Sequence, residues 1–138
     1  MSELEARREL VQAWLGKATQ DLSAAEVLNR DQDAFSEVIL FHCQQAAEKA
    51  LKSFLQWSDK RPPRTHDLIL LLGLCVDLNP QFEELAESCQ ALQALAVDPR
   101  YPVEASDPDF LPPDEAIQYA HHVLDCVISV LPGEALAE

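Results

Sequence analysis

The 138-residue sequence has few of the residues and patterns that mark sheets, phosphate-binding loops and disulfide frameworks. Its three glycines, Gly16, Gly73 and Gly133, are isolated, which excludes a glycine-rich phosphate loop. No segment alternates polar and apolar residues over several positions, so no β-strand is expected. The four cysteines form no Cys-x-x-Cys pair and fall among apolar residues of expected helices, which predicts buried, reduced thiols. They are Cys43, Cys75, Cys89 and Cys126.

Long apolar runs are absent as well. No stretch of about 18 apolar residues is free of charge, so we expect no membrane span. The N-terminal MSELEARREL is charged and has no apolar signal core, which favours a cytoplasmic protein over a secreted one. No cofactor motif is present, and we expect no cofactor.

Basic residues are scarce, and nearly all of them lie in the first half of a chain whose formal net charge is −14. Residues 1–64 hold ten acids and nine bases, whereas residues 65–138 hold fourteen acids and a single base, Arg100. An acidic surface repels phosphate chains, so tight nonspecific nucleic-acid binding is not expected. The alternative interpretation is that the acidity serves solubility alone. An anionic ligand would have to use the few basic residues Lys49, Lys52, Lys60, Arg61, Arg64 and Arg100.

The apolar positions predict an all-α, up-and-down bundle of about five helices. We expect one domain over residues 1–133 and a flexible tail over residues 134–138. The expected helices cover about residues 2–28, 34–57, 65–78, 79–96 and 113–131. Residues 97–112 hold four prolines and no periodicity, and connectors of this length are often functional.

Local signals set the ends of these helices. Ser2 and Glu5 form a capping box for the first helix. Thr65 is expected to cap the third helix, and Asn79 followed by Pro80 to end it and begin the fourth. The inner faces are expected to include Trp14 and Leu15 in the first helix and Ile117 and Ile128 in the last.

The helix expected at residues 34–57 carries one polar stripe on otherwise apolar faces. Gln45, Lys49, Lys52 and Gln56 follow one another at the 3.6-residue period of a helix. A largely buried helix keeps such a line of polar side chains only where water, a partner or a ligand receives them. The stripe is therefore the first place to look for function.

The same region resembles a known family. The run FHCQQAAEKALK at residues 41–52, Thr-His-Asp-Leu at 65–68 and Arg100-Tyr101-Pro102 occur here in the order seen in the HEPN family, named for a nucleotide-binding role in higher eukaryotes and prokaryotes. Trp14, Ala18 and Asp21-Leu22 also resemble its first helix, so the resemblance spans roughly residues 14–128. It implies a helical fold, and a function among ribonuclease toxins, partners of nucleotidyltransferases and members of other roles.

The ribonuclease members of that family resemble one another in an Arg followed four to six residues later by His. The His would be the acid/base and the Arg would stabilise phosphorane charge. No His follows Arg100 at this spacing. Arg61 and His66 have four residues between them, but Pro62-Pro63 puts them in a loop outside the motif's place, so we interpret that spacing as coincidence. An enzyme is therefore not expected.

Two histidine pairs have the spacing of metal ligands but point away from each other. His121 with Asp125 and His122 with Cys126 are each four residues apart, and the two pairs differ in direction by about 100° on a helix. They cannot share one ion, so no metal site is expected.

The resemblance further implies that polar residues converge at one end of the bundle to bind a ligand or partner. Periodicity alone places only Gln45 and Lys49 on one face. His42 could instead be a satisfied core histidine, and His66 could serve only as a helix cap. The candidate binding residues are His42, Gln45, Lys49, Lys52, Arg64, His66, Arg100 and Tyr101.

Two functions of different kinds remain open. The resemblance implies a noncatalytic accessory partner of a separate minimal nucleotidyltransferase, as in a toxin–antitoxin pair. The alternative is a homodimeric module that holds a nucleotide or another anion against Lys49, Arg64 and Arg100. A degenerate RNA binder is disfavoured by the acidic second half. In each case we expect a homodimer, because the family commonly pairs and the chain is apolar-rich for its size.

Overall fold

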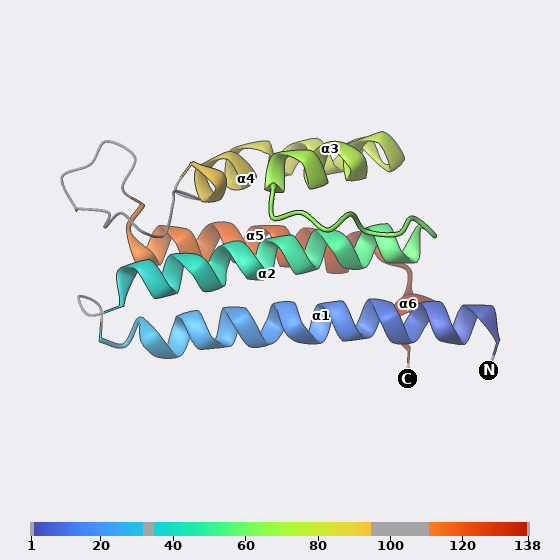
Figure 1. The fold of residues 1–138 in the computed structure, drawn as a ribbon, viewed down its shortest axis with the longest axis horizontal. Helices are drawn as coiled ribbons and strands as arrows, with labels where there is room; N and C mark the ends of the chain where they lie inside the picture. The colour runs from blue at the N-terminus through green and yellow to red at the C-terminus, as the bar shows by residue number, and fades with distance from the viewer. Residues whose placement is uncertain (1, 32–34, 95–110, 138) are drawn as a thin grey trace.

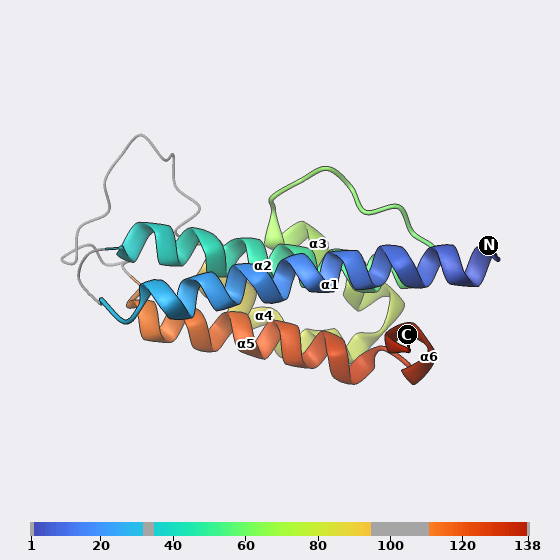
Figure 2. The same ribbon diagram turned by 90° about the horizontal axis from the view of Figure 1, so that it is seen from below.

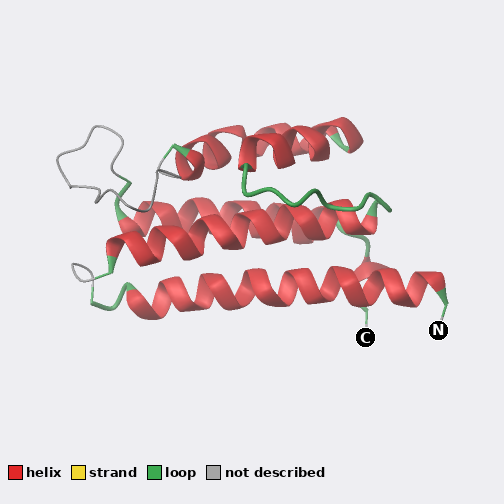
Figure 3. Cartoon of the chain, viewed as in Figure 1, coloured by secondary structure: helices red, strands yellow, loops and turns green. Residues whose placement is uncertain are grey.

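The computed structural model describes residues 2–31, 35–94 and 111–137, and all regular elements in these ranges are helical (Figure 3). The sequence-based expectation of an all-α bundle with about five main helices is confirmed. The elements are α1 (Glu3–Leu28), α2 (Ser36–Trp57), α3 (Leu68–Leu78), the 3₁₀ helix η1 (Pro80–Leu85), α4 (Ala86–Gln93), α5 (Pro113–Val130) and the short α6 (Gly133–Leu136).

Helices α1 and α2 form the long hairpin on which the rest is built (Figure 1). The predicted capping box is present, since the Ser2 hydroxyl accepts from the Glu5 amide and the Glu5 carboxylate accepts from the Ser2 amide. Helix α2 is the central element and contacts α1, α3, α4 and α5. It begins at Ser36, whereas the sequence predicted a start near residue 34, which lies outside the described residues.

Helices α3 and α4, joined by η1, make a layer on the opposite side of α2 and α5 from α1 (Figure 1). The expected N-cap Thr65 is wrong, because Asp67 caps α3 and its Oδ1 accepts from the amides of Ile69 and Leu70. Thr65 instead accepts from the Asp67 amide and supports the cap. Asn79 ends α3 and caps the next element as predicted, but that element starts as a 3₁₀ turn before α4.

One apolar core runs between the two layers, and Ile39, Leu51, Leu55, Leu71, Phe82 and Val123 are among its fully buried side chains. The expected burial of Ile128 is wrong, since that side chain is exposed near the end of α5. Leu15 and Ile117 are only partly buried at the edge of the core, and Trp14 is also only partly buried. The apolar faces of α1 and α5 are wider than the surface that the neighbouring helices cover. The spacing of apolar residues in the sequence therefore predicts more buried side chains than the structure contains.

The last residues, which we expected to be a flexible tail, include α6 packed beside the start of α1 (Figure 2). Ala135 is fully buried. Arg8 donates to the carbonyl of Glu134 at 2.7 Å, and Gln12 donates to the carbonyl of Ala137 at 2.6 Å. These contacts secure the C-terminal residues to α1. Within the described residues, none of the helices has the length and apolar character needed to cross a membrane.

Candidate functional site

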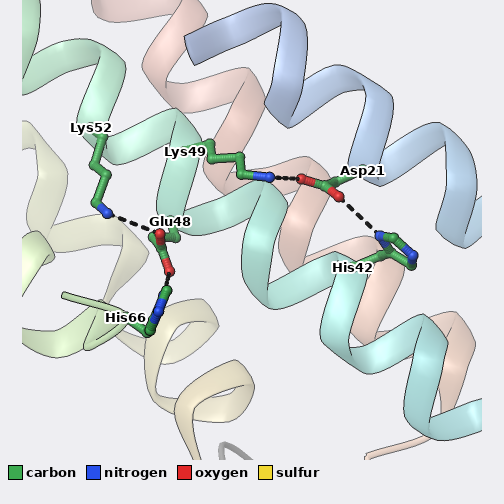
Figure 4. A network of polar contacts seen from close by, with 6 residues as sticks. All are labelled: Asp21, His42, Glu48, Lys49, Lys52 and His66. Carbon is green, nitrogen blue, oxygen red and sulfur yellow. Dashed lines mark hydrogen bonds and ion pairs between the residues drawn. The ribbon is translucent and has the colours of Figure 1, made fainter. Parts of the chain in front are cut away.

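The polar stripe of α2 is organised into two clusters, each centred on a carboxylate (Figure 4). We call them the Asp21 cluster, made of Asp21, His42 and Lys49, and the Glu48 cluster, made of Glu48, Lys52 and His66. In both clusters one carboxylate lies between a lysine ammonium and a histidine imidazole.

The Asp21 cluster joins α1 to α2. Asp21 projects from α1, and its Oδ2 lies 2.5 Å from Nζ of Lys49 while its Oδ1 lies 2.9 Å from Nδ1 of His42. All three side chains are mostly buried in the seam between the helices. His42 and Lys49 are seven residues apart, so both stand on the face of α2 that meets α1. A charge-assisted pair of this kind stabilises the hairpin only while both partners are present.

The Glu48 cluster joins α2 to the segment that leads into α3. Oε2 of Glu48 lies 2.9 Å from Nζ of Lys52, its i, i+4 neighbour. Oε1 lies 2.7 Å from Nδ1 of His66, just ahead of α3. The Glu48 side chain is 5% exposed and that of His66 is 84% exposed. Lys52 also lies 5.5 Å from the centre of the Trp14 ring, a cation–π contact that helps a buried ammonium.

Both lysines of the stripe therefore have carboxylate partners within this chain. Each buried ammonium is matched by one negative charge, so neither cluster leaves a free buried cation among the described residues. The sequence resemblance includes Asp21, but it does not indicate that Asp21 is the partner of Lys49. One feature of the sequence does point to this role of Asp21. It is an acid among the apolar and small residues Ala18, Leu22 and Ala25 on the inner face of the first helix.

Two further candidates, Gln45 and Arg64, make no hydrogen bond or ion pair with these clusters. Gln45 is partly buried on α2, and its side chain has no hydrogen bond to the described part of the chain. Arg64 is exposed in the loop before α3. That loop meets α3 at the middle of the bundle rather than at its end (Figure 1). Arg100 and Tyr101 lie outside the described residues, so the expected convergence of all eight is not tested.

The two histidine pairs of α5 are used in other ways. His121 contacts Glu26 of α1 at 2.8 Å through Nε2, and Nδ1 of His122 lies 2.8 Å from the Ser88 hydroxyl. Over residues 2–31, 35–94 and 111–137, no three metal-ligating side chains gather in one place. The i, i+4 spacing seen in the sequence thus reflects contacts to neighbouring helices.

The four cysteine thiols are buried and unlinked. Burial raises the pKa of each thiol from 9.0 to about 12, and at Cys43 the charge of Glu26 adds to this effect. A thiol is a nucleophile or metal ligand only as a thiolate, so these side chains act as small apolar groups at neutral pH.

A row of apolar side chains on α3 faces outward. Ile69, Leu70, Leu74 and Leu78 are between 37% and 49% exposed, although their helix is only eleven residues long. Leu70, Leu74 and Leu78 are four residues apart, so they form a ridge along one side of the helix. Exposed apolar ridges of this kind usually bind a partner.

Comparison with known proteins gives one consistent result. The sequence model of the HEPN domain family matches residues 11–131. The crystal structure of ST0689, an archaeal HEPN homologue, is similar to this chain with a TM-score of 0.66 and 27% identity, covering 86% of this chain and 95% of that one. No curated protein matches the sequence. The resemblance read from residues 41–52, 65–68 and 100–102 is confirmed.

Proposed function

This chain belongs to the HEPN family, and from that premise we propose that it is a noncatalytic binding module that pairs with a separate minimal nucleotidyltransferase. The family resemblance supports the class of partner. Within the chain, the proposal is carried by one observation, the exposed apolar ridge of α3 made of Ile69, Leu70, Leu74 and Leu78.

The ridge fits a protein partner better than a small ligand. Helix α3 lies in the outer α3–α4 layer (Figure 1), and the segment that forms this layer also carries exposed acids. They include Asp67, Asp77, Glu83 and Glu87. An apolar strip with a charged rim is the usual anatomy of a protein interface. The acidic rim favours a partner surface with basic residues, and it repels polyanions.

The noncatalytic part of the proposal has separate support. His42, Lys49, Lys52 and His66 are each paired with a carboxylate, so these four side chains have partners without a substrate. The Arg61/His66 spacing falls in the loop before α3, and His66 is fixed there by Glu48.

The alternative is a homodimeric module that binds a nucleotide or another anion. It is favoured by the exposed loop residues Lys60, Arg61 and Arg64, the only concentration of basic side chains in the described part of an acidic chain. The pairing of Lys49 with Asp21 works against this alternative, since Lys49 was one of the three cations expected to hold the ligand.

Co-expression tests the proposal directly. The chain is produced with a minimal nucleotidyltransferase encoded beside it in the same genome, and the complex is isolated through a tag on the nucleotidyltransferase. We expect the two proteins to purify together, and the double variant Leu70→Gln/Leu74→Gln to lose the complex. Each truncated anchor costs about 1–2 kcal/mol, so affinity should fall about a hundredfold. Leu10→Gln, an equally exposed leucine on α1, is the matched control.

Two results would contradict the proposal: no complex with the wild-type chain, or a complex that survives the α3 variant unchanged. Binding of a nucleotide by the free chain, abolished by Arg64→Ala, would favour the alternative.

A further inference from the structure

His66 combines two properties that rarely occur together. Its side chain is 84% exposed, yet Nδ1 is held 2.7 Å from a carboxylate oxygen of Glu48, whose side chain is 5% exposed. Lys52 already provides Glu48 with a cation at 2.9 Å. The histidine is therefore not needed to neutralise the buried carboxylate. The contact instead fixes the imidazole at the surface in one orientation.

The contact also determines which ring nitrogen carries the proton. An ionised carboxylate only accepts hydrogen bonds, and Glu48 already accepts one from Lys52. Nδ1 of His66 must then be the N–H donor, so in the neutral ring Nε2 holds the free electron pair. A carboxylate behind an imidazole holds the ring in one tautomer and stabilises the positive charge that the ring gains when the distal nitrogen forms a bond.

The other three histidines lack one or both properties. His42 has the same kind of contact with Asp21, but its side chain is only 26% exposed. His121 contacts Glu26 through Nε2 rather than Nδ1, and the Glu26 side chain is itself exposed. His122 meets the Ser88 hydroxyl and no carboxylate in the described residues. His66 is the only histidine with a buried carboxylate behind it and an exposed ring in front.

The surroundings of His66 select for anionic reactants. Lys60, Arg61 and Arg64 are exposed in the same loop, within six residues of His66 in sequence. The formal net charge of the chain is −14, so this loop is where a phosphorylated molecule is least repelled.

We propose that His66 is a phosphoryl acceptor, modified on Nε2 by a donor of the phosphoramidate or acyl phosphate class. Nε2 attacks phosphorus and forms the N–P bond, while the bond from phosphorus to the leaving group breaks and the leaving group keeps its electron pair. The Nδ1 proton stays in its contact with Glu48, and the positive charge of the imidazolium is offset by the phosphoryl group that the ring now carries. The modification adds a dianion to the loop that also carries Lys60, Arg61 and Arg64, and it does not require the nucleotidyltransferase partner.

The test uses the full chain and potassium phosphoramidate, with phosphohistidine located by mass spectrometry under alkaline conditions. We expect His66 to be phosphorylated first, at a rate about tenfold or more above that of the exposed His121. Urea-unfolded chain, in which both histidines are free, should lose this difference. His66→Asn should abolish the fast modification, and His121→Asn should leave it unchanged.

The role of Glu48 is tested within the same molecule. Glu48→Gln should slow modification of His66 while leaving that of His121 unaltered, and circular dichroism reports whether the variant is folded. If Glu48→Gln does not fold, the comparison of His66 with His121 in the wild-type chain still decides the outcome. Equal rates at the two histidines, or no modification at His66, would overturn the proposal.

Discussion

Nζ of Lys49 on α2 lies 2.5 Å from Oδ2 of Asp21 on α1, joining two helices through residues 28 positions apart in the chain. The second oxygen of Asp21 contacts His42 at 2.9 Å. One carboxylate thus receives two polar side chains from the central helix. Lys49, which the sequence predicts to bind a ligand, therefore helps to hold α1 against α2.

Removal of Lys49 should therefore destabilise the fold. Lys49→Ala leaves Asp21 with only His42 in a mostly buried seam, and an unpaired buried acceptor costs about 1–3 kcal/mol. Urea denaturation followed by circular dichroism should show a loss of this size in the free energy of unfolding. Lys17→Ala, an exposed lysine on the same helix as Asp21, should change it by less than about 0.5 kcal/mol.

A double-mutant cycle measures the interaction between the charges of Asp21 and Lys49 apart from the loss of side-chain packing. Asp21→Asn with Lys49→Met should cost less than the sum of the two single changes, because neither variant side chain leaves a buried charge. Strict additivity would show that the two charges do not interact in solution.

The fold could be predicted from the sequence because its signals are local. The capping box of Ser2 and Glu5, Asn79 followed by Pro80, and the start of α5 at Pro113 all depend on neighbouring residues. The sequence predicts Thr65 as the cap of α3 and Asp67 in the first turn, yet both residue types favour the cap position. The helical backbone begins only at Leu68, directly after Asp67, and this makes Asp67 the cap.

The site was less predictable because its pairing depends on tertiary contacts. Periodicity gives the face of α2 on which Lys49 lies, but not that Asp21 of α1 stands opposite. Glu48 lies on the same helix and looks like an ordinary i, i+4 partner of Lys52. That the chain returns through residues 58–67 to place His66 against it cannot be read from either helix alone.

The chain should form a homodimer through a surface other than α3. Val38 and Phe41 lie one turn apart on α2, and both are among the exposed large apolar residues. Light scattering at micromolar concentration should give the mass of a dimer, and Val38→Gln/Phe41→Gln should give a monomer. Leu70→Gln/Leu74→Gln should remain dimeric. A monomer from the α3 variant would assign the α3 ridge to self-association, and a monomeric wild-type chain would contradict the prediction.

Purified chain should leave single-stranded RNA intact. No His follows Arg100 within four to six residues in the sequence, and His66 is oriented by Glu48 in the loop that precedes α3. RNA integrity is followed on a denaturing gel at several chain concentrations. Cleavage that disappears in both Arg61→Ala and His66→Ala would show that the spacing of these two residues is catalytic after all.

The buried thiols should make the fold sensitive to alkali. Burial raises the pKa of Cys43, Cys75, Cys89 and Cys126 from 9.0 to about 12, so above pH 9 the unfolded chain loses protons that the folded chain keeps. The stabilising effect of a neutral buried thiol is complete below the unfolded pKa and is lost as the pH rises between these two values. Over this pH range, each thiol lowers the free energy of unfolding by up to about 1.4 kcal/mol per pH unit.

Cys43→Ala isolates this effect from the titration of tyrosines and lysines, which is common to both proteins. The free energy of unfolding in urea should fall less steeply between about pH 9 and pH 11 in the variant, by roughly one thiol's share. At neutral pH a disulfide reagent should label the folded chain far more slowly than the unfolded chain, since a buried thiol ionises too rarely to react. Equal slopes for the two proteins, or rapid labelling of the folded chain, would show that water reaches Cys43 and that the seam between α1 and α2 opens in solution.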